Sequence, residues 1–451
     1  MNTDPRETLA KSPMCWLQIL AVTITIGLNA LDGFDALSMS FALPGVATEW
    51  GVQPGRLGIL ASMGLVGMAL GSLLLGGVAD RIGRRKTTLG CLVLMTFGMF
   101  MATTARSVVE LSVYRIITGL GIGGLLAAIN AIAAEFSNAK RRDVSVTIMS
   151  IGYPLGAVFG GMIVQQLLKT HDWRAVFYFG AAVTAVFIPL VLLFVPESVY
   201  WLVRKQPAGA LEAINKTMSR MGHATVTALP VIAADVRKRS FSDIFAPGYL
   251  AITILVSVTY FFHVTTFYYI VTWAPKIVVN MGFTPSQGAG VLVWANVGGA
   301  LGGILLGALS QRFALKPLTI TVMILGCIAV FVFGRSPHEL PALSMFIILS
   351  GFFTNAAISG MYAIFAKAFP THVRASGTGV AIGIGRGGSV IAPIIAGYLF
   401  QAGVSFPTVS AIMSLGSLLA AGVLSMLKLR PDQAEHLPDA DSAPIRGATT
   451  A

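Results

Sequence analysis

The sequence predicts an all-α membrane protein whose twelve transmembrane helices form two halves of six. Of its 451 residues, 55% are hydrophobic and only 11% are charged, whereas a soluble domain usually has about 25% charged residues. Polar groups could not cover a surface of this composition, so lipid is the expected solvent. The apolar runs are continuous and do not alternate with period two, which argues against a β-barrel.

Twelve apolar runs follow one another along the chain. Each is long enough to cross a hydrocarbon core of roughly 30 Å as a helix. The first run follows a polar start and is long, so we expect it to remain as a span and not to be cleaved as a signal peptide. The runs cover residues 14–43, 57–79, 87–105, 109–134, 144–168, 175–195, 249–275, 286–309, 318–334, 341–366, 375–400 and 408–427.

Lysine and arginine are distributed unequally between the two sides of the predicted bundle. Twelve spans place both termini on one side, and the segments on that side carry 23 of the 31 Lys and Arg residues. The loops on the other side carry six, and Arg115 and Arg386 lie inside spans. Because cytoplasmic loops are enriched in Lys and Arg, we expect both termini in the cytoplasm and the protein in a plasma or inner membrane. Basic loops that face anionic lipid also explain the net charge of +12 without a nucleic-acid partner.

One long polar segment, residues 196–248, divides the spans into two groups of six. We expect a cytoplasmic N-terminus (1–13), an N-terminal half (14–195), this central cytoplasmic loop, a C-terminal half (249–427) and a disordered cytoplasmic tail (428–451). Two halves of six spans are typical of secondary transporters, which bind substrate between their halves near the membrane midplane.

The first span carries three polar residues, Asn29, Asp32 and Asp35, in the sequence NALDGFDAL. Their i, i+3 spacing places them on one face of a helix. Ionisable groups are costly in lipid and are therefore candidates for function. Two carboxylates one turn apart repel each other in a medium of low dielectric constant, so one of them is expected to bind and release a proton near neutral pH. We interpret Asp32 and Asp35 as proton-coupling residues and Asn29 as a substrate contact; a purely structural role would need a separate partner for each Asp.

The eleventh span contains Arg386 within GVAIGIGRGGSV. A guanidinium cannot lose its proton, so in lipid it needs an anion. That anion is either a carboxylate of the protein or a substrate carboxylate that binds two of the guanidinium N–H groups. We favour the substrate, with an internal ion pair as the alternative.

Further polar and aromatic residues fall near the middle of other spans, where they would form a polar ring at the midplane. His263 lies among aromatic residues and is by itself more typical of a hydrogen-bonded packing residue, but its neighbours would suit an aromatic ligand. The residues that we assign as candidate substrate contacts, besides Arg386 and Asn29, are Tyr153, Tyr260, His263, Trp294, Asn296 and Asn355.

The charged residues at the span ends are predicted to form gates. Arg115 begins the fourth span, where it could face the cavity or fix the end of a close helix contact, and Glu135 ends the same span. Glu135 is expected to join a salt-bridge network and not to act as a proton site. In the fifth span, glycines four residues apart (152, 156 and 160) predict a smooth face for close packing. The residues assigned to gating are Asp80, Arg81, Arg84, Arg115, Glu135 and Arg142.

No catalytic chemistry is indicated. The three cysteines lie far apart without a CxxC pair, so neither a metal site nor a disulfide framework is expected. The glycine run GLGIGG lies inside a span with no strand before it, so it is not a dinucleotide-binding motif. A Walker A sequence is missing, so we expect no ATP-driven pumping, no enzyme activity and no cofactor besides the proton as coupling ion.

The loop GGVADRIGRRK, together with RIITGLGIGG and PESVYWL, resembles the major facilitator superfamily, whose signature loop joins the second and third spans. Its counterpart in the second half, GALSQRFALK, lacks the Asp and most basic residues. Within the superfamily, LDGFD is similar to the Asp-Gly-x-Asp mark of the aromatic acid:proton symporter family, and FPTHVRASGTGVAIGIGRGG resembles its eleventh span.

The resemblance implies proton-coupled import of an aromatic acid such as a hydroxybenzoate. We expect the twelve-helix chain to function as a monomer. It implicates Asp32 and Asp35 in coupling, Asp80 in the gating loop and Arg386 in anion handling. Related branches carry aliphatic acids such as muconate, or sugar acids, and these stay as alternatives. A proton-driven exporter of the same fold is a second alternative. A membrane receptor is a third, which the small size of residues 196–248 disfavours.

Overall fold

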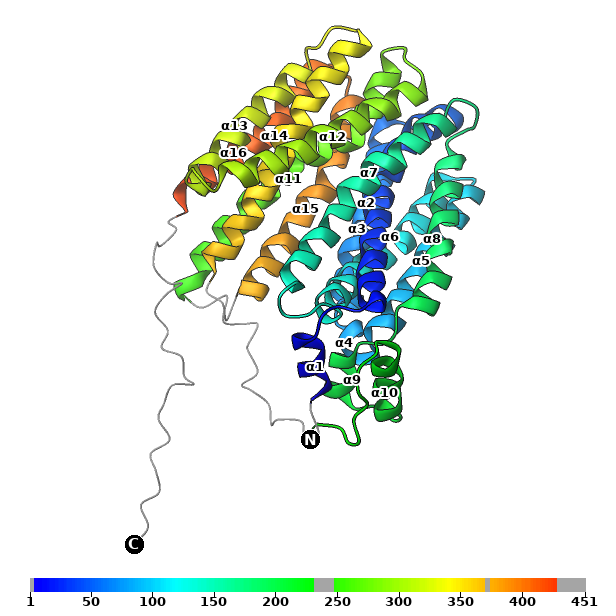
Figure 1. Ribbon diagram of the computed structural model, residues 1–451. Helices are drawn as coiled ribbons and strands as arrows, with labels where there is room; N and C mark the ends of the chain where they lie inside the picture. Colours follow the sequence, from blue (N-terminus) through cyan, green and yellow to red (C-terminus); the bar gives the residue numbers. More distant parts are fainter. Residues whose placement is uncertain (1–3, 231–246, 370–373, 428–451) are drawn as a thin grey trace.

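The computed structural model describes residues 4–230, 247–369 and 374–427, and these residues form helices and connecting loops (Figure 1). Twelve of the described helices are long and apolar enough to cross a membrane, so the protein is a multi-pass membrane protein. They are α2 (Trp16–Trp50), α3 (Pro54–Leu75), α5 (Arg84–Thr104), α6 (Val108–Glu135), α7 (Arg142–Leu167), α8 (Arg174–Phe194), α11 (Pro247–Asn280), α12 (Pro285–Leu309), α13 (Leu315–Phe333), α14 (Leu340–Ala368), α15 (Arg374–Gln401) and α16 (Phe406–Met426).

The predicted spans correspond one to one to these helices, and the twelve-helix fold class is confirmed. The largest difference lies in the first span, which was predicted to end at residue 43, just before Pro44. The helix instead continues through Pro44 to Trp50 and ends at Gly51, whose φ of 58° is left-handed. Proline removes one backbone hydrogen bond from a helix, and here the helix is held in place by packing, with Pro44 itself buried.

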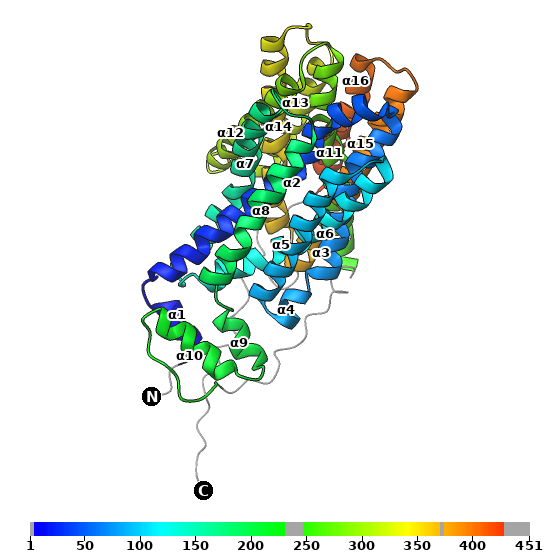
Figure 2. The ribbon, with the colours of Figure 1, turned by 90° about the vertical axis from the view of Figure 1, so that its right-hand side faces the viewer.

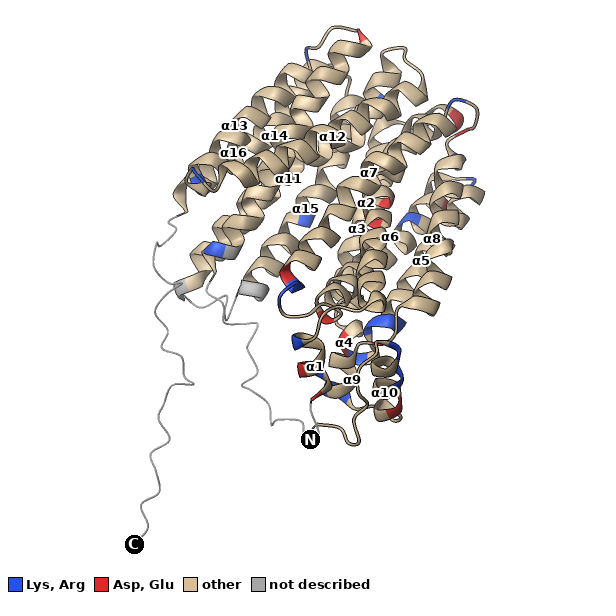
Figure 3. Ribbon diagram, viewed as in Figure 1, with Lys and Arg blue, Asp and Glu red and all other residues tan. Residues whose placement is uncertain are grey.

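Four short helices lie together on one side of the bundle, which we call the basic side: α1 (Pro5–Lys11), α4 (Val78–Ile82), α9 (Val199–Lys205) and α10 (Ala210–Arg220) (Figure 2). Figure 3 shows that most charged residues of the described chain gather there. The sequence predicted only a polar loop for residues 196–248. The structure adds α9 and α10, because Trp201, Ile214 and Met218 supply an apolar face that joins the buried cluster of the N-terminal half. Residues 231–246 and the predicted tail 428–451 lie outside the described residues.

Glycine allows helices to approach closely within each half. The backbone of α7 at Gly156 lies against the α2 backbone at Ala30, and Gly119 of α6 lies against Gly64 of α3. In the other half Gly351 of α14 lies against Ala295 of α12 in the same way. A methyl group at any of these positions would collide with a neighbouring backbone, so these contacts fix the helix pairs that carry the central residues.

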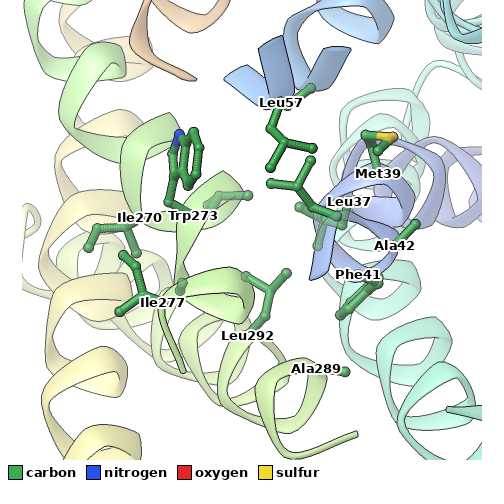
Figure 4. Close-up of a cluster of buried hydrophobic side chains, with 14 of the residues drawn as sticks. Leu37, Met39, Phe41, Ala42, Leu57, Ile270, Trp273, Ile277, Ala289 and Leu292 are labelled. Atoms are coloured by element: carbon green, nitrogen blue, oxygen red, sulfur yellow. The ribbon is translucent and has the colours of Figure 1, made fainter. Parts of the chain in front are cut away.

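The two halves touch along α3 and α15, and also where the end of α7 meets the start of α12. At the side opposite the basic side, Gly55 N–H donates to Gln401 Oε1 (3.1 Å) and Ser286 Oγ donates to the carbonyl of Gln165 (2.7 Å). Figure 4 shows a cluster of apolar side chains from both halves, including Leu57 and Trp273. The contacts between α7 and α12 lie at the end of α7 and the start of α12, where Gly161 meets Val293, and toward the basic side these two helices lie apart in Figure 1.

Candidate functional site

Asp32 and Asp35 lie in the middle of α2, but their carboxyl groups meet different surroundings. Asp32 is 4% exposed, and the cation that acts on it electrostatically is Arg386 of the other half. Asp35 is fully buried within the N-terminal half, next to Gly180 of α8, and the cation that acts on it is Arg115 of α6. Although both residues lie on one face of α2, Asp32 is therefore close to the C-terminal half, whereas Asp35 is enclosed by the N-terminal half.

Neither carboxyl group is satisfied by hydrogen bonds from the described residues. Both oxygens of Asp35 and Oδ1 of Asp32 are buried without a partner. A buried carboxylate without hydrogen bonds is costly, whereas a protonated carboxyl is much less so. The geometry thus suits groups that hold a proton in this conformation.

Arg115 is a buried cation of the N-terminal half, with 2% of its surface exposed. Its Nη2 donates to the backbone carbonyl of Asp35 (3.0 Å), and its guanidinium lies 5.6 Å from the ring centre of Phe177. Its Nε has no hydrogen-bond partner among the described residues, and no salt bridge joins it to the Asp35 carboxyl. Arg115 also lines a small cavity between the halves with Ser40, Tyr268 and Thr272. Arg115 thus lies in the wall of a cavity and also beside Gly64, where α3 and α6 approach closely, so the structure combines the two positions expected for it.

Arg386 reaches from α15 to α3 of the other half. Its Nη1 donates to Ser72 Oγ (2.6 Å) and to the carbonyl of Met68 (3.1 Å). No carboxylate of the described residues lies within salt-bridge distance, 4.0 Å, of this guanidinium. Among the described residues, Arg386 therefore does not form the internal ion pair that was one of the two alternatives expected for it.

Four tyrosines, Tyr153, Tyr260, Tyr268 and Tyr362, lie close enough to Arg386 to interact with it electrostatically. Tyr153 of α7 lies near enough to Asp32, Arg386 and two further tyrosines, Tyr268 and Tyr362, to interact with them electrostatically. The hydroxyl groups of Tyr260 and Tyr362 share a hydrogen bond of 2.8 Å. Tyr362 is 44% exposed, so its ring is accessible. Aromatic faces and hydroxyl groups here could contact a planar ring and its polar substituents.

Sequence reasoning missed Tyr268 and Tyr362. Both lie in apolar runs, Tyr268 in TTFYYIV and Tyr362 in SGMYAIF, with no charge beside them. Tyrosine within a span was the only signal, and it also occurs at ordinary packing positions. Their importance depends on how α11 and α14 are placed relative to α2, which a single sequence does not reveal.

Two of the candidate substrate contacts, Asn29 and His263, are hydrogen-bonded within the protein and join helices. The Asn29 amide donates to the carbonyl of Met149 (2.9 Å) and so joins α2 to α7. His263 is fully buried, with Nε2 2.9 Å from the carbonyl of Thr354 and Nδ1 3.0 Å from Ser417 Oγ. These partners join α11 to α14 and α16. The described structure therefore favours the packing role for His263.

Two further candidates, Asn296 and Asn355, are partly buried and donate to carbonyls of their own helices. Trp294 was a wrong assignment. It is 50% exposed, and ideal helix geometry places it about 200° around α12 from Leu292, which belongs to the central apolar cluster, whereas Asn296 lies only about 40° from Leu292. Trp294 therefore faces away from the space between the halves, on the same lateral surface as Leu301, which is also exposed.

The predicted gate network lies on the basic side within the N-terminal half. Arg84 Nη2 pairs with Glu135 (3.0 Å) and Arg84 Nη1 with Asp80 (2.9 Å). Glu197, from the PESVYWL segment, accepts the backbone N–H groups of Arg84 and Arg85 at the start of α5 (2.7 and 3.2 Å). A carboxylate at a helix N-terminus is favourable, so α4, α5, α6 and the segment before α9 are held together.

The remaining gating candidates differ in their contacts. Arg142 donates to the carbonyl of Ala134 (3.2 Å) and to the hydroxyl of Tyr200 (3.2 Å), which joins α7 to α9. Arg81 is exposed and forms no ion pair with the described residues. Within the part of the chain that the structure describes, every ion pair joins residues between Asp4 and Arg204, before the C-terminal half begins, and no group of three His, Cys, Asp or Glu side chains could hold a metal ion.

Comparison with known proteins gives matches over almost the whole chain. A family profile described as Major Facilitator Superfamily matches residues 25–333 and 256–449. The chain is 26% identical to a gallate transporter of Pseudomonas putida over 422 residues, which cover 93% of each chain. It is 28% identical to the 4-hydroxybenzoate transporter PcaK of Acinetobacter baylyi, with 93% of each chain covered. It is also 28% identical to a 3-(3-hydroxy-phenyl)propionate transporter of Escherichia coli, with 92% of this chain and 96% of the relative covered.

Solved structures agree on the fold. A D-xylose-proton symporter superposes with a TM-score of 0.68 at 19% identity, covering 91% of this chain and 98% of that one. The nucleoside transporter NupG superposes with a TM-score of 0.69 at 14% identity, covering 91% of this chain and all of that one. At such identities the likeness concerns the fold alone.

Proposed function

Since the chain belongs to the major facilitator superfamily, we propose that it imports an aromatic carboxylate, such as a hydroxybenzoate, together with protons by alternating access. The family predicted from GGVADRIGRRK and LDGFD, the aromatic acid:proton symporter family, is confirmed by these matches. The protein is a secondary transporter and not an enzyme. Relatives named for gallate, 4-hydroxybenzoate and 3-(3-hydroxy-phenyl)propionate support an aromatic acid as the substrate.

The observation that carries the proposal is Arg386, a membrane-embedded cation without a carboxylate partner among the described residues, facing a group of tyrosines. A substrate carboxylate would supply the missing anion through charge-assisted hydrogen bonds. Tyr153, Tyr268 and Tyr362 would lie along the ring of the substrate. An aliphatic acid would use the same guanidinium but gain less from the aromatic faces.

The different surroundings of Asp32 and Asp35 support different roles. Asp32 shares the space between the halves with Arg386, so its protonation changes the net charge that the substrate meets. Asp35 is enclosed within the N-terminal half and interacts electrostatically with Arg115. In this proposal Asp35 acts as a proton-coupling residue that does not contact substrate. Asp32 acts both in coupling and as part of the binding space.

Alternating access requires the halves to close on one side while they open on the other. In the proposed orientation the basic side is cytoplasmic, as the excess of Lys and Arg in its loops favours, and the membrane is a plasma or inner membrane. The hydrogen bonds donated by Gly55 and Ser286 then close the halves at their outer end. Protonation outside would neutralise a carboxylate and lower the cost of enclosing it in the occluded state, and the low proton activity inside would return the charge.

Uptake into proteoliposomes tests the proposal, with Asp32→Asn and Asp35→Asn as the variants and Asp143→Asn, an exposed carboxylate at the start of α7, as the control. We expect Asp35→Asn to lose accumulation driven by a proton gradient but to keep exchange of labelled for unlabelled substrate. Asp32→Asn should weaken both, because Asp32 lies in the binding space. Full proton-driven accumulation in both variants would overturn the coupling roles.

The direction of proton movement separates import from the export alternative. If substrate added outside acidifies the vesicle interior, protons and substrate move together. If substrate movement is instead accompanied by proton movement in the opposite direction, the protein is an exchanger, and the import proposal fails.

A further inference from the structure

We propose that the side opposite the basic side carries a second carboxylate-binding site, lined by Arg56 and Arg106, at which the substrate docks before it enters the space between the halves. The inference rests on the proposed function, because it takes the substrate to be an aromatic carboxylate and this side to be the outer one.

The site is an open cavity of about 510 Å³ between the loop that joins α2 to α3 and the loop that joins α5 to α6. Arg56 and Arg106 line it from these two segments, and Trp50 at the end of α2 forms an apolar part of its wall. The Trp50 ring is partly exposed and is held in place edge-to-face by Trp173, with 5.4 Å between ring centres. Gln53 and Ser107 add polar groups.

Both arginines are exposed, and neither guanidinium has an ion pair or hydrogen bond with the described residues. Two other arginines on this side have partners: Arg174 pairs with Glu49 (2.7 Å), and Arg335 lies over the ring of Phe331 (3.7 Å). One carboxylate, Glu110, is close in sequence, but it accepts the backbone N–H of Arg106 and lies beyond salt-bridge distance from the guanidinium.

The cavity adjoins the contact that closes this side. Gly55, the neighbour of Arg56 in the chain, donates its N–H to Gln401 of the other half (3.1 Å). Gly397 of α15 packs against the backbone of Pro54. When these contacts open, an anion held by Arg56 lies at the start of the path between the halves. The site also remains accessible in the conformation described here, in which the path itself is closed.

The chemistry of the cavity fits an aromatic carboxylate. Two guanidinium groups can share the charge of one carboxylate, and an indole face can contact its ring. An exposed site of this kind binds weakly, because water and salt screen the charges. Its effect is to raise the local concentration of anions beside the entrance and so to speed their capture.

The test is the concentration dependence of proton-driven uptake in proteoliposomes for benzoate, 4-hydroxybenzoate and protocatechuate. The double variant Arg56→Gln/Arg106→Gln is compared with wild type and with Lys169→Gln, which removes an exposed cation on the same side outside the cavity. At low ionic strength we expect KM of the double variant to rise about tenfold, with an unchanged maximal rate, because capture by steering is weakened. In about 0.5 M salt the difference should disappear, since the screening length then falls to a few ångströms. The double variant Arg56→Lys/Arg106→Lys keeps both positive charges, so its KM at low ionic strength should stay close to that of wild type.

A KM within twofold of wild type at low salt would overturn the docking site while leaving the proposed function intact. A fall in the maximal rate that salt does not alter would also overturn it, because that result means a structural effect on the adjoining contact. If wild type transports none of the three acids, the proposed function fails, and this inference fails with it.

Discussion

Replacement of Arg386 by glutamine is the sharpest test of substrate binding in the central site. In the structure Nη1 of Arg386 donates to Ser72 and to the Met68 carbonyl, and no described carboxylate lies within 4.0 Å. The other N–H groups of the guanidinium are available to a substrate. Glutamine removes the positive charge and the pair of parallel N–H groups but remains polar.

The expected loss follows from the strength of such contacts. A hydrogen bond to a charged group contributes about 1.5–3 kcal/mol, and the two bonds of a fork are not additive. A loss of about 2 kcal/mol corresponds to roughly 30-fold weaker binding, since about 1.4 kcal/mol is a factor of ten. Arg386→Lys should lie between wild type and Arg386→Gln, because lysine keeps the charge but cannot bind a carboxylate with two parallel N–H groups.

The assay is equilibrium binding of an aromatic acid and of its uncharged carboxamide to purified protein. Wild type should prefer the acid, and Arg386→Gln should lose most of that preference. Ser72→Ala is the matched control, because it removes an acceptor from the same guanidinium without changing the charge; we expect it to bind the acid at least as well as wild type. Binding of the acid to Arg386→Gln within threefold of wild type would refute the reasoning, as would uptake restricted to compounds without a carboxylate.

Two further predictions concern the frame around the site. Gly156→Ala places a methyl group against the α2 backbone and should destabilise the protein by about 1–3 kcal/mol, seen as a lower melting temperature in detergent, whereas Gly90→Ala, which meets nothing within 4 Å inside α5, should not lower it. Equal melting temperatures would contradict the close packing. Glu135→Gln removes a carboxylate from the buried Arg84 and should slow transport at saturating substrate while leaving substrate affinity unchanged; Glu212→Gln, on an exposed part of α10, is its control. A reduced affinity in Glu135→Gln would argue against a gating role.

Hydropathy predicted the twelve spans because lipid imposes a single requirement, an apolar helix about 20 residues long. The same scale could not predict α9 and α10. Their apolar residues, such as Trp201 and Ile214, are few and lie in a polar segment, and they are buried only because the N-terminal half offers a surface for them. Helices this short depend on such packing for their stability.

The charged site residues were predictable because each is an exception within an apolar run. Asp32, Asp35 and Arg386 were found for that reason. The arrangement around them was not predictable. The i, i+3 spacing of the two carboxyl groups gives one helix face, but which neighbour each meets depends on α6, α8 and α15. Trp294 failed for a related reason: aromatic residues near mid-span occur on both faces of a helix, and only the packing of α12 shows that this one faces outward.

The contacts between the halves explain why a few charges could switch this protein. In the described residues no ion pair crosses from one half to the other. On the side opposite the basic side, Gly55 and Ser286 donate neutral hydrogen bonds, each worth about 0.5–1.5 kcal/mol. The charged donor that crosses is Arg386, whose bonds to Ser72 and Met68 are worth about 1.5–3 kcal/mol each.

In the proposed mechanism, a substrate carboxylate that draws the whole Arg386 guanidinium toward itself also competes with those two α3 acceptors for Nη1, and so weakens the contact between α15 and α3. Shifting a two-state equilibrium from 1:99 to 99:1 takes about 5.5 kcal/mol of differential binding. Loss of the two Arg386 bonds supplies a large part of that amount, and neutralisation of a buried carboxyl group can supply the rest. Binding at Arg386 and protonation at Asp32 would then both be needed before the halves rearrange, which is the condition for coupled transport.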